Sequence, residues 1–474
     1  MKRKDFVHLS GILAAGTLLS PSSLFAQILS GSFPIVRTAP SNRKFRSIAV
    51  ETTIAEFKKK CKNQELVWLF ENCFPNTLDT TVDFEIINGK PDTYVITGDI
   101  DAMWLRDSTA QVWPYLSLVK DDKPLQQLIA GVINRQTKNI LFDPYANAFY
   151  KDTSKISEWK DDNTDMKAGI HERKWEIDSL CYPLRLSYHY WKKTGDKLPF
   201  DEKWKEAAKL IVKTFKEQQR KTEKGPYKFE RKTSWATDGV PLGGYGYPAN
   251  PVGLIFSMFR PSDDATIFPF LIPSNFFAAI SLQQLSEMST AIYNDKIFAK
   301  ECADMANEIK NALNKYAVVT HPVYGKVYAY EINGFGSFNL MDDANVPSLL
   351  SLPYLGALQN TDPIYINTRK LLLSNSNPFF YKGSAGEGIG GPHAGIDLIW
   401  PISIIIRAIT SNSDIEIQNC LKTLQASNAG TGFMHETFHK NDVTKFTRSW
   451  FAWANTIFGE LLHNIMENKP HLLS

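Results

Sequence analysis

The sequence predicts an all-α fold, and three observations lead to this prediction. Apolar residues recur at helical spacing in roughly a dozen segments, period-two strands are few and short, and no Gly/Ser- or Pro-rich linker divides residues 45–474. Two connections, 225–272 and 376–395, are longer than loops normally are unless they serve a function. We therefore expect one helical domain whose long loops carry the chemistry.

The clearest helices are predicted over 200–217 and 294–317. In the first, Trp204, Ile211 and Phe215 fall on one face, and the second repeats apolar residues in the same way. Comparable patterns occur near 53–72, 108–119, 124–141, 176–193, 274–289, 364–374, 396–410, 414–426 and 448–466. The candidate strands are 83–87, 94–96 and 327–332.

The composition is that of a folded protein and excludes several classes of function. The chain has 474 residues, 43% hydrophobic and 22% charged. Its net charge of +3 is too balanced for a nucleic-acid binder that works through a basic face. Its five cysteines include no C-x-x-C pair, which favours buried free thiols over a disulfide scaffold or a cysteine zinc site, with one disulfide as the alternative.

Residues 1–26 are predicted to direct export. Three basic residues at 2–4 precede the apolar run 9–19, and the small residue Ala26 ends the segment. That run is shorter than the roughly 20 residues that cross a bilayer. The basic start resembles a twin-arginine signal, with the general export route as the alternative. We expect an extension over 27–49, a catalytic domain over 50–474, no membrane span in the mature chain, and a periplasmic or extracellular location.

Two short motifs match known signatures but lack the context that these signatures require. His435-Glu436-Thr437-Phe438-His439 matches the zinc-protease pattern H-E-x-x-H, which must lie on a helix, yet glycines precede it and no helical stripe continues through it. Gly386-x-Gly388-x-x-Gly391 matches the dinucleotide fingerprint, but no buried strand is predicted before it and no helix after it. A zinc metallopeptidase is therefore kept only as an alternative.

Carboxylates and aromatic side chains gather in four segments. The first, 98–108, places Asp101, Trp104, Arg106 and Asp107 just before a helix. Indole packs against the C–H faces of sugars, and carboxylates and guanidinium grip hydroxyl pairs, so this segment favours sugar binding. The simpler interpretation is that Asp107 caps the helix and Arg106 forms an ion pair.

The other three segments supply candidate catalytic carboxyl groups. Asp263 and Asp264 are adjacent, and burial would raise the pKa of one toward that of a general acid. Glu436 lies between histidine and aromatic residues, with Arg448 downstream. The segment 171–178 is rich in charge and opens a helix. Glycoside hydrolysis commonly needs two such carboxyl groups, so these loops favour a glycoside hydrolase.

Five segments together resemble glycoside hydrolase family 125. They are TGDIDAMWLRDSTAQVWPYL (97–116), FRPSDDA (259–265), LIPSN (271–275), GFMHETF (432–438) and FTRSWFAWANTIFGEL (446–461). The likeness runs from about residue 50 to 466. It implies an (α/α)6 barrel with long active-site loops at one end, and an exo-acting α-1,6-mannosidase that inverts configuration and needs no metal or other cofactor. Thr266–Phe268 departs from the family's pattern, which puts a neighbouring subsite in doubt.

The resemblance also implies roles for individual residues. It makes Glu436 the general base and Asp263 the general acid, with Asp264 as the alternative acid. The implied substrate-binding residues are Asp101, Trp104, Arg106, Asp107, Arg260, Ser274, Asn275, His393 and Arg448. An inverting pair of carboxyl groups should lie about 6.5–9.5 Å apart, with a water between them.

The implied partner is an α-mannoside oligosaccharide or N-glycan fragment, not nucleic acid. We expect a monomer or a small homo-oligomer. A non-catalytic carbohydrate-binding protein is the third possibility, and it would need the aromatic platform without paired carboxylates.

Overall fold

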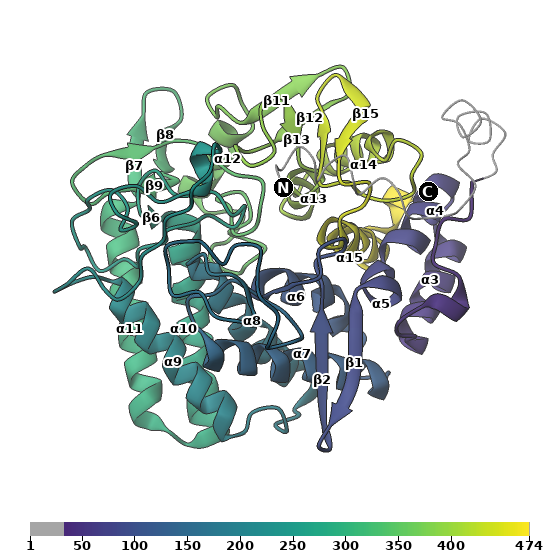
Figure 1. Cartoon of the computed structure of the whole chain (residues 1–474). Coiled ribbons are helices and arrows are strands. Elements are labelled where there is room, and N and C mark those ends of the chain that lie inside the picture. Colours follow the sequence, from purple (N-terminus) through teal and green to yellow (C-terminus); the bar gives the residue numbers. More distant parts are fainter. Residues whose placement is uncertain (1–32, 474) are drawn as a thin grey trace.

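A computed structural model describes residues 33–473, and the predicted export segment 1–26 lies outside them. Within the described range, twelve α-helices have eight or more residues (Figure 1). Their bounds are α3 Ile48–Lys60, α4 Gln64–Cys73, α6 Leu105–Val112, α7 Lys123–Phe142, α8 Ile177–Thr194, α9 Glu202–Gln218, α10 Ile272–Tyr293, α11 Lys296–Tyr316, α12 Pro363–Leu372, α13 Pro401–Ile409, α14 Asp414–Ser427 and α15 Ala452–Asn468.

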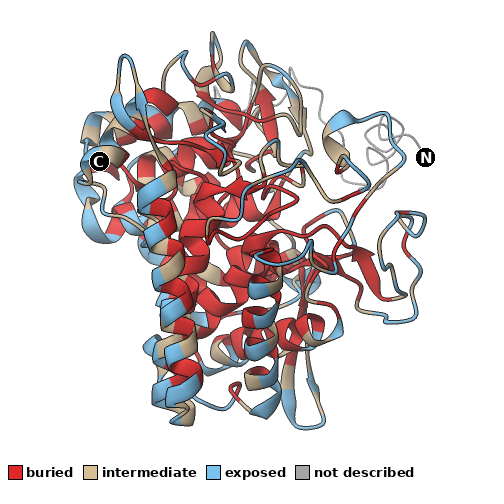
Figure 2. Cartoon of the chain, turned by 90° about the vertical axis from the view of Figure 1, so that its left-hand side faces the viewer, coloured by how far each residue is buried: buried red, intermediate tan, exposed pale blue. Residues whose placement is uncertain are grey.

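The helices form an inner and an outer ring. In the inner ring α13 packs on α15, α15 on α6, α6 on α8, and α8 on α10. The buried segment 344–352 continues this ring between α10 and α13. Outer helices such as α9 and α11 expose one face and bury the other, and Figure 2 shows such two-faced helices at the surface. Every residue of α6, in contrast, is buried. This is the arrangement expected of an (α/α)6 barrel.

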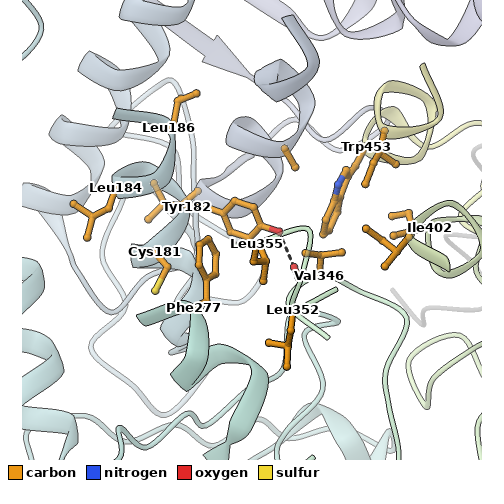
Figure 3. Close-up of a cluster of buried hydrophobic side chains, with 14 of the residues drawn as sticks. Cys181, Tyr182, Leu184, Leu186, Phe277, Val346, Leu352, Leu355, Ile402 and Trp453 are labelled. Carbon is orange, nitrogen blue, oxygen red and sulfur yellow. Dashed lines mark hydrogen bonds between the residues drawn. The ribbon is translucent and has the colours of Figure 1, made fainter. Parts of the chain in front are cut away.

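The core of the barrel is filled by side chains from the inner ring. Tyr182 on α8 packs edge-on against Phe277 on α10, with ring centroids 5.1 Å apart, and faces Trp453 on α15 (Figure 3). Its hydroxyl donates to the carbonyl of Val346 over 2.8 Å. One buried tyrosine therefore ties two helices to the irregular segment, with its polar end satisfied.

Local chemistry sets the helix ends. Asp201 accepts from the backbone N–H groups of Lys203 and Trp204 at the start of α9, as an N-cap should. The single helix expected over 53–72 is wrong, because the chain is extended at Cys61 and Asn63 caps a new helix, α4. All five cysteines are buried and free.

Short antiparallel sheets are more numerous than the sequence suggested. Within residues 33–473, six sheets of two or three strands link the helices. Figure 1 shows those from β6 to β15 in its upper half. The strands are β1 Val82–Ile87, β2 Lys90–Val95, β3 Met103–Trp104, β4 Ala148–Phe149, β5 Ile170–Glu172, β6 Phe270–Leu271, β7 Val318–His321, β8 Gly325–Tyr328, β9 Glu331–Ile332, β10 Phe338–Asn339, β11 Phe380–Gly383, β12 Gly386–Ile389, β13 Leu398–Ile399, β14 Thr437–His439 and β15 Asp442–Thr447.

One of the sheets positions functional candidates. The sheet β3-β4-β5 sets Trp104 opposite Ala148, and Ala148 opposite Glu172. The strand expected over 327–332 is in fact two, because β9 leaves β8 to pair with β6 just before α10.

The N-terminal segment before α3 packs on the barrel. Arg37 pairs with Glu51 and Asp79, at 2.6 and 2.7 Å.

Among residues 33–473, no helix is both long and apolar enough to cross a membrane.

Candidate active site

Arg106 is the centre of a buried charge cluster. It lies in the first turn of α6 and is 3% exposed. Its Nη1 donates to Glu176 Oε2 at 2.5 Å and to Asp178 Oδ2 at 3.2 Å, and its Nη2 donates to Asp263 Oδ1 at 3.0 Å. The start of α6, the start of α8 and the loop 259–265 thus meet at one guanidinium, which can bridge several carboxylates in fixed directions.

Asp263 and Asp264 have different surroundings, although they are adjacent. The side chain of Asp263 is 22% exposed and that of Asp264 is 2% exposed. Asp263 has a φ of 66°, a left-handed conformation that aspartate tolerates better than most residues. Asp264 turns inward and accepts from Ser262 Oγ at 3.2 Å. Only Asp263 combines the contact with Arg106 and access to solvent.

Burial and charge move the pKa values of this cluster apart. Burial raises the pKa of Asp178 to about 6 and that of Glu176 well above its usual range, although Arg106 opposes both shifts. Burial also acts to raise the pKa of Asp263, but Arg106, Lys174 and a hydrogen bond with Glu176 outweigh it and hold that pKa well below its usual range. Glu176 is therefore the carboxyl group that keeps a proton most readily.

A second ionic network binds the backbone of the loop that carries Asp263. Lys174 Nζ donates to the carbonyl of Asp263 at 2.9 Å and to Asp238 Oδ1 at 2.6 Å. Arg231 pairs with the same Asp238 at 3.1 Å and with Glu172 at 2.9 Å. Sequence reasoning noted Glu172 and Lys174 only as a charged segment, and it missed Arg231 and Asp238.

Glu436 lies on the other side of Asp107, paired with a different arginine. Its Oε1 is 3.5 Å from Nη1 of Arg448, and its side chain is 14% exposed. Arg448 also donates to the carbonyl of Thr97 at 2.9 Å and pairs with Asp99. Glu436 immediately precedes β14, and the β14–β15 hairpin returns the chain to Arg448.

Asp107 links the two halves of the site. Its Oδ1 accepts from Thr97 Oγ1 at 2.6 Å, and its Oδ2 lies 3.6 Å from Nε of Arg106. The charge of Asp107 acts to raise the pKa of Arg448, and the charge of Asp263 acts to raise the pKa of Asp107. The cluster is therefore continuous from Asp263 to Glu436.

Trp104 is a strand residue rather than the loop residue that the sequence suggested. It is 6% exposed, and its indole meets His171 edge-on with ring centroids 5.0 Å apart. Its Nε1 is buried without a hydrogen-bond partner among the described residues. An unpaired buried donor is costly to the fold, so this N–H is a feature that packing alone does not explain.

Three other predicted binding residues lie outside the cluster around Arg106. The side chain of Asp101 is 69% exposed and pairs with Lys155 at 2.8 Å, so it belongs to the outer surface. Ser274 and Asn275 have no exposed area. Asn275 bonds only the backbone of Ile255 and Leu271. Both side chains are sealed in the first turns of α10, and their contact with substrate stays a prediction.

Arg260 and His393 flank the loop of Asp263. Arg260 is buried and donates to Glu331 Oε1 at 2.7 Å, so it anchors this loop to β9. His393 Nδ1 is 3.9 Å from Asp264 Oδ1, and its side chain is 17% exposed.

The two signature-like motifs adopt structures that exclude their usual functions. His435 is buried, stacks on Phe446 with ring centroids 3.8 Å apart, and faces two carbonyl oxygens, while His439 ends β14. The two histidines are thus not one helical turn apart, as zinc binding requires. No group of metal-binding side chains occurs in the described part of the chain. Gly386–Ile389 is a hairpin strand with no helix directly after it.

A surface hollow of about 810 Å³ lies elsewhere, between α9 and α11. Its lining includes Lys216, Glu301 and Glu308 from the outer ring, and none of the residues around Arg106. Three pairs of its charged residues bind each other, as in the 2.5 Å contact of Lys216 with Glu301. We place the candidate active site at the cluster of Arg106.

Comparisons with known proteins agree with this arrangement. The sequence matches the family described as metal-independent alpha-mannosidase (GH125) over residues 63–463. It is 44% identical over 458 residues to the meiotically up-regulated gene 157 protein of Schizosaccharomyces pombe, covering 93% of this chain and 90% of that protein.

A solved structure from Streptococcus pneumoniae is also similar. It belongs to a new family of metal-independent alpha mannosidases and is a non-productive substrate complex with alpha-1,6-mannobiose. It is 40% identical, has a TM-score of 0.86, and covers 90% of this chain and 100% of that chain. This likeness confirms the predicted (α/α)6 barrel.

Proposed function

The chain belongs to the metal-independent α-mannosidases of glycoside hydrolase family 125, and from this premise we propose that it removes single mannose residues from non-reducing α-1,6-linked ends by a single displacement that inverts the anomeric configuration. The substrate is an α-mannoside oligosaccharide or N-glycan fragment. The observation that carries the proposal is the paired arrangement of Asp263 and Glu436, each held by its own arginine within one charge cluster.

The linkage rests on the Streptococcus pneumoniae enzyme. That protein is described in complex with alpha-1,6-mannobiose, and at 40% identity over its whole length the two chains share one barrel. In the present chain, buried carboxylates and arginines surround the position for a sugar, which suits the many hydroxyl groups of mannose.

We assign Asp263 as the general acid. It is the more exposed of the adjacent aspartates, and Arg106, Asn147 and Lys174 fix its position. In the mechanism it protonates the glycosidic oxygen as the bond to the anomeric carbon breaks. Asp264, which is buried against Ser262, holds the loop in shape.

We assign Glu436 as the general base. It takes a proton from a water molecule that attacks the opposite face of the anomeric carbon. Nη1 of Arg448 lies 3.5 Å from Oε1 of Glu436 and holds this carboxyl group in place. Inversion follows because the oxygen enters on the face opposite to the departing one.

Four further residues are proposed to bind the terminal sugar. Arg106, Asp107 and Arg448 provide charged groups along the line between acid and base, and Trp104 provides a free indole N–H next to them in the sequence. Arg260 and His393 are proposed to support the loop of Asp263 rather than to bind the sugar. Arg260 is paired with Glu331, and His393 faces Asp264.

Export is proposed on the sequence of residues 1–26 alone, with the mature enzyme in the periplasm or outside the cell. Fractionating cells that express the full chain, with N-terminal sequencing of the product, tests this. A product that keeps its N-terminus in the cytoplasm would contradict export.

The proposed activity is tested with the purified chain and three mannobioses. We expect mannose release from the α-1,6 isomer and much slower release from the α-1,2 and α-1,3 isomers. Glu436→Gln and Asp263→Asn serve as matched inactive controls, because both substitutions keep size and remove the carboxyl group. Equal hydrolysis of all three isomers would overturn the linkage, and undiminished activity of both variants would overturn the site.

A further inference from the structure

Glu176 presents an unusual arrangement around its two carboxyl oxygens. Its Oε2 receives Arg106 Nη1 at 2.5 Å and Ser179 Oγ at 2.7 Å. Its Oε1 is fully buried, and no N–H or O–H group of the described residues reaches it. One oxygen is thus saturated with donors, and the other has none.

The oxygen without a donor is explained by a proton of its own. Arg106 brings the two carboxyl groups together, since its Nη1 binds Glu176 at 2.5 Å and its Nη2 binds Asp263 at 3.0 Å. A hydrogen bond between these two side chains acts to raise the pKa of Glu176 and to lower that of Asp263. Two carboxyl groups can form such a bond only when one of them carries the proton. Because Glu176 has no exposed area and Asp263 is open to solvent and bound to Arg106, the proton resides on Glu176, which donates to Asp263.

Charge in the cluster requires the same proton. Arg106 faces Glu176, Asp178 and Asp263 within 3.2 Å, and Asp107 lies at 3.6 Å. One guanidinium cannot balance these four carboxylates, of which Asp107, Glu176 and Asp178 are buried and Asp263 is partly exposed. Other charged groups also act on these four: Lys174, His393 and Glu172 act on Asp263, and Arg448 acts on Asp107.

From this geometry we infer that Glu176 is a proton-holding partner of the general acid and supplies the proton that Asp263 delivers to the departing glycosidic oxygen. The inference rests on the proposed function, in which Asp263 is that acid. It adds a residue that acts through Asp263 and does not touch the sugar. Asp263, which is ionised in the free enzyme, thereby acts as an acid without a raised pKa of its own.

The protons balance over one turnover. Oε1 of Glu176 first passes its proton to the ionised carboxylate of Asp263. As the bond between the anomeric carbon and the glycosidic oxygen breaks, that oxygen takes this proton from Asp263, which returns to its ionised form. The attacking water gives one proton to Glu436, and its oxygen bonds to the anomeric carbon. After the products leave, Glu436 releases its proton to solvent and Glu176 regains one.

The test compares two substrates that differ in their need for an acid. α-1,6-Mannobiose has a poor leaving group that must be protonated. 2,4-Dinitrophenyl α-mannoside instead releases 2,4-dinitrophenolate, which is a stable anion without protonation. Glu176→Gln keeps the shape and the bond to Arg106 but has no proton to transfer. We expect its kcat on mannobiose to fall by about 10²-fold or more, as for loss of general acid catalysis, with little change on the dinitrophenyl substrate.

Two controls separate this role from a structural one. Glu176→Asp keeps a transferable proton in the cluster and should recover part of the mannobiose activity. Glu460→Gln makes the same change at another buried glutamate, which contacts Trp113 and Tyr354 rather than Arg106, and should leave the ratio of the two rates unchanged. The activity on the dinitrophenyl substrate also reports that each variant is folded.

The outcomes are distinct. The alkaline limb of kcat/KM on mannobiose should move to lower pH in Glu176→Gln, because Asp263 alone holds a proton only at acid pH. Equal losses on both substrates, or no loss on either, would overturn the proton-holding role. If Asp263→Asn also shows no dependence on the leaving group, the acid assignment fails with it. If Asp263→Asn does show this dependence and Glu176→Gln does not, only the present inference fails.

Discussion

Nη2 of Arg106 lies 3.0 Å from Oδ1 of Asp263, although 157 positions separate the two residues in the sequence. Through this contact the first turn of an inner helix fixes the direction of a carboxylate on a long loop. The neighbouring Asp264 makes no such contact and faces the interior. The roles of the two aspartates should therefore separate clearly by substitution.

Asp263→Asn should lower kcat on α-1,6-mannobiose by about 10²–10⁴-fold, because the leaving oxygen is no longer protonated. Activity on 2,4-dinitrophenyl α-mannoside should change far less. Asp264→Asn keeps an oxygen for Ser262 and should lower activity much less than Asp263→Asn does. Steady-state kinetics on both substrates check this, and a larger loss in Asp264→Asn would reverse the assignment.

Glu436→Gln should lose activity on both substrates, because attack by water is needed whatever the leaving group. We expect at least a 10²-fold fall in kcat, with little change in KM for mannobiose. A variant that retains its activity on the dinitrophenyl substrate would show that Glu436 is not the base.

Arg106→Met should destabilise the fold in a pH-dependent way. Removing the guanidinium leaves buried carboxyl groups without a partner, at a cost of about 3–5 kcal/mol near neutral pH. Without Arg106 their folded-state pKa values rise further above the unfolded values, so the loss should be small at pH 4 and grow as the pH rises. Urea unfolding at several pH values measures this.

Arg369→Met is the matched control, since Arg369 forms a 2.7 Å pair with Glu416 in which both side chains are partly exposed. It should cost less, with a weaker dependence on pH. Equal losses for Arg106→Met at low and neutral pH would contradict the charge cluster.

Glu460 should make stability depend on pH. Burial raises its pKa from 4.5 to about 7. Because the folded-state pKa lies above the unfolded one, its contribution is fully present below about pH 4.5 and is lost as the pH rises to about 7. Glu460→Gln should therefore gain stability over the wild type across this window, on the order of 3 kcal/mol. A constant difference from pH 4 to 8, measured by urea unfolding, would be inconsistent with this shift.

Removal of metal should leave the enzyme active. His435 is buried against Phe446, and His439 ends a strand, so the H-E-x-x-H motif is not arranged to hold zinc. Dialysis against a chelator should leave mannose release unchanged, and metal analysis should find no stoichiometric zinc. One zinc per chain, together with loss of activity on chelation, would favour the peptidase instead.

The sequence predicted the long helices well because their apolar residues repeat over several turns. Helices expected over 200–217 and 294–317 are found as α9 and α11, within two residues at each end. It failed at α3 and α4, where a short extended break with a new N-cap interrupts one apolar stripe. Two-residue strands such as β3 are too short to show a period of two, so Trp104 was expected in a loop.

The candidate site was predictable only in part. Motifs located Asp263 and Glu436, but adjacent aspartates in one motif cannot be distinguished until the turn shows which one faces outward. Glu176 is separated from Asp263 by 87 positions, so no local pattern indicates their hydrogen bond. Asn275 lies in a matching motif, yet it serves the backbone at the start of α10.

The stereochemistry of the first product tests the central claim most directly. Proton NMR of α-1,6-mannobiose with the enzyme should show β-mannose first, with the α-anomer appearing only as the sugar mutarotates, because water attacks opposite to the departing oxygen. Appearance of α-mannose first would contradict the single displacement by Asp263 and Glu436.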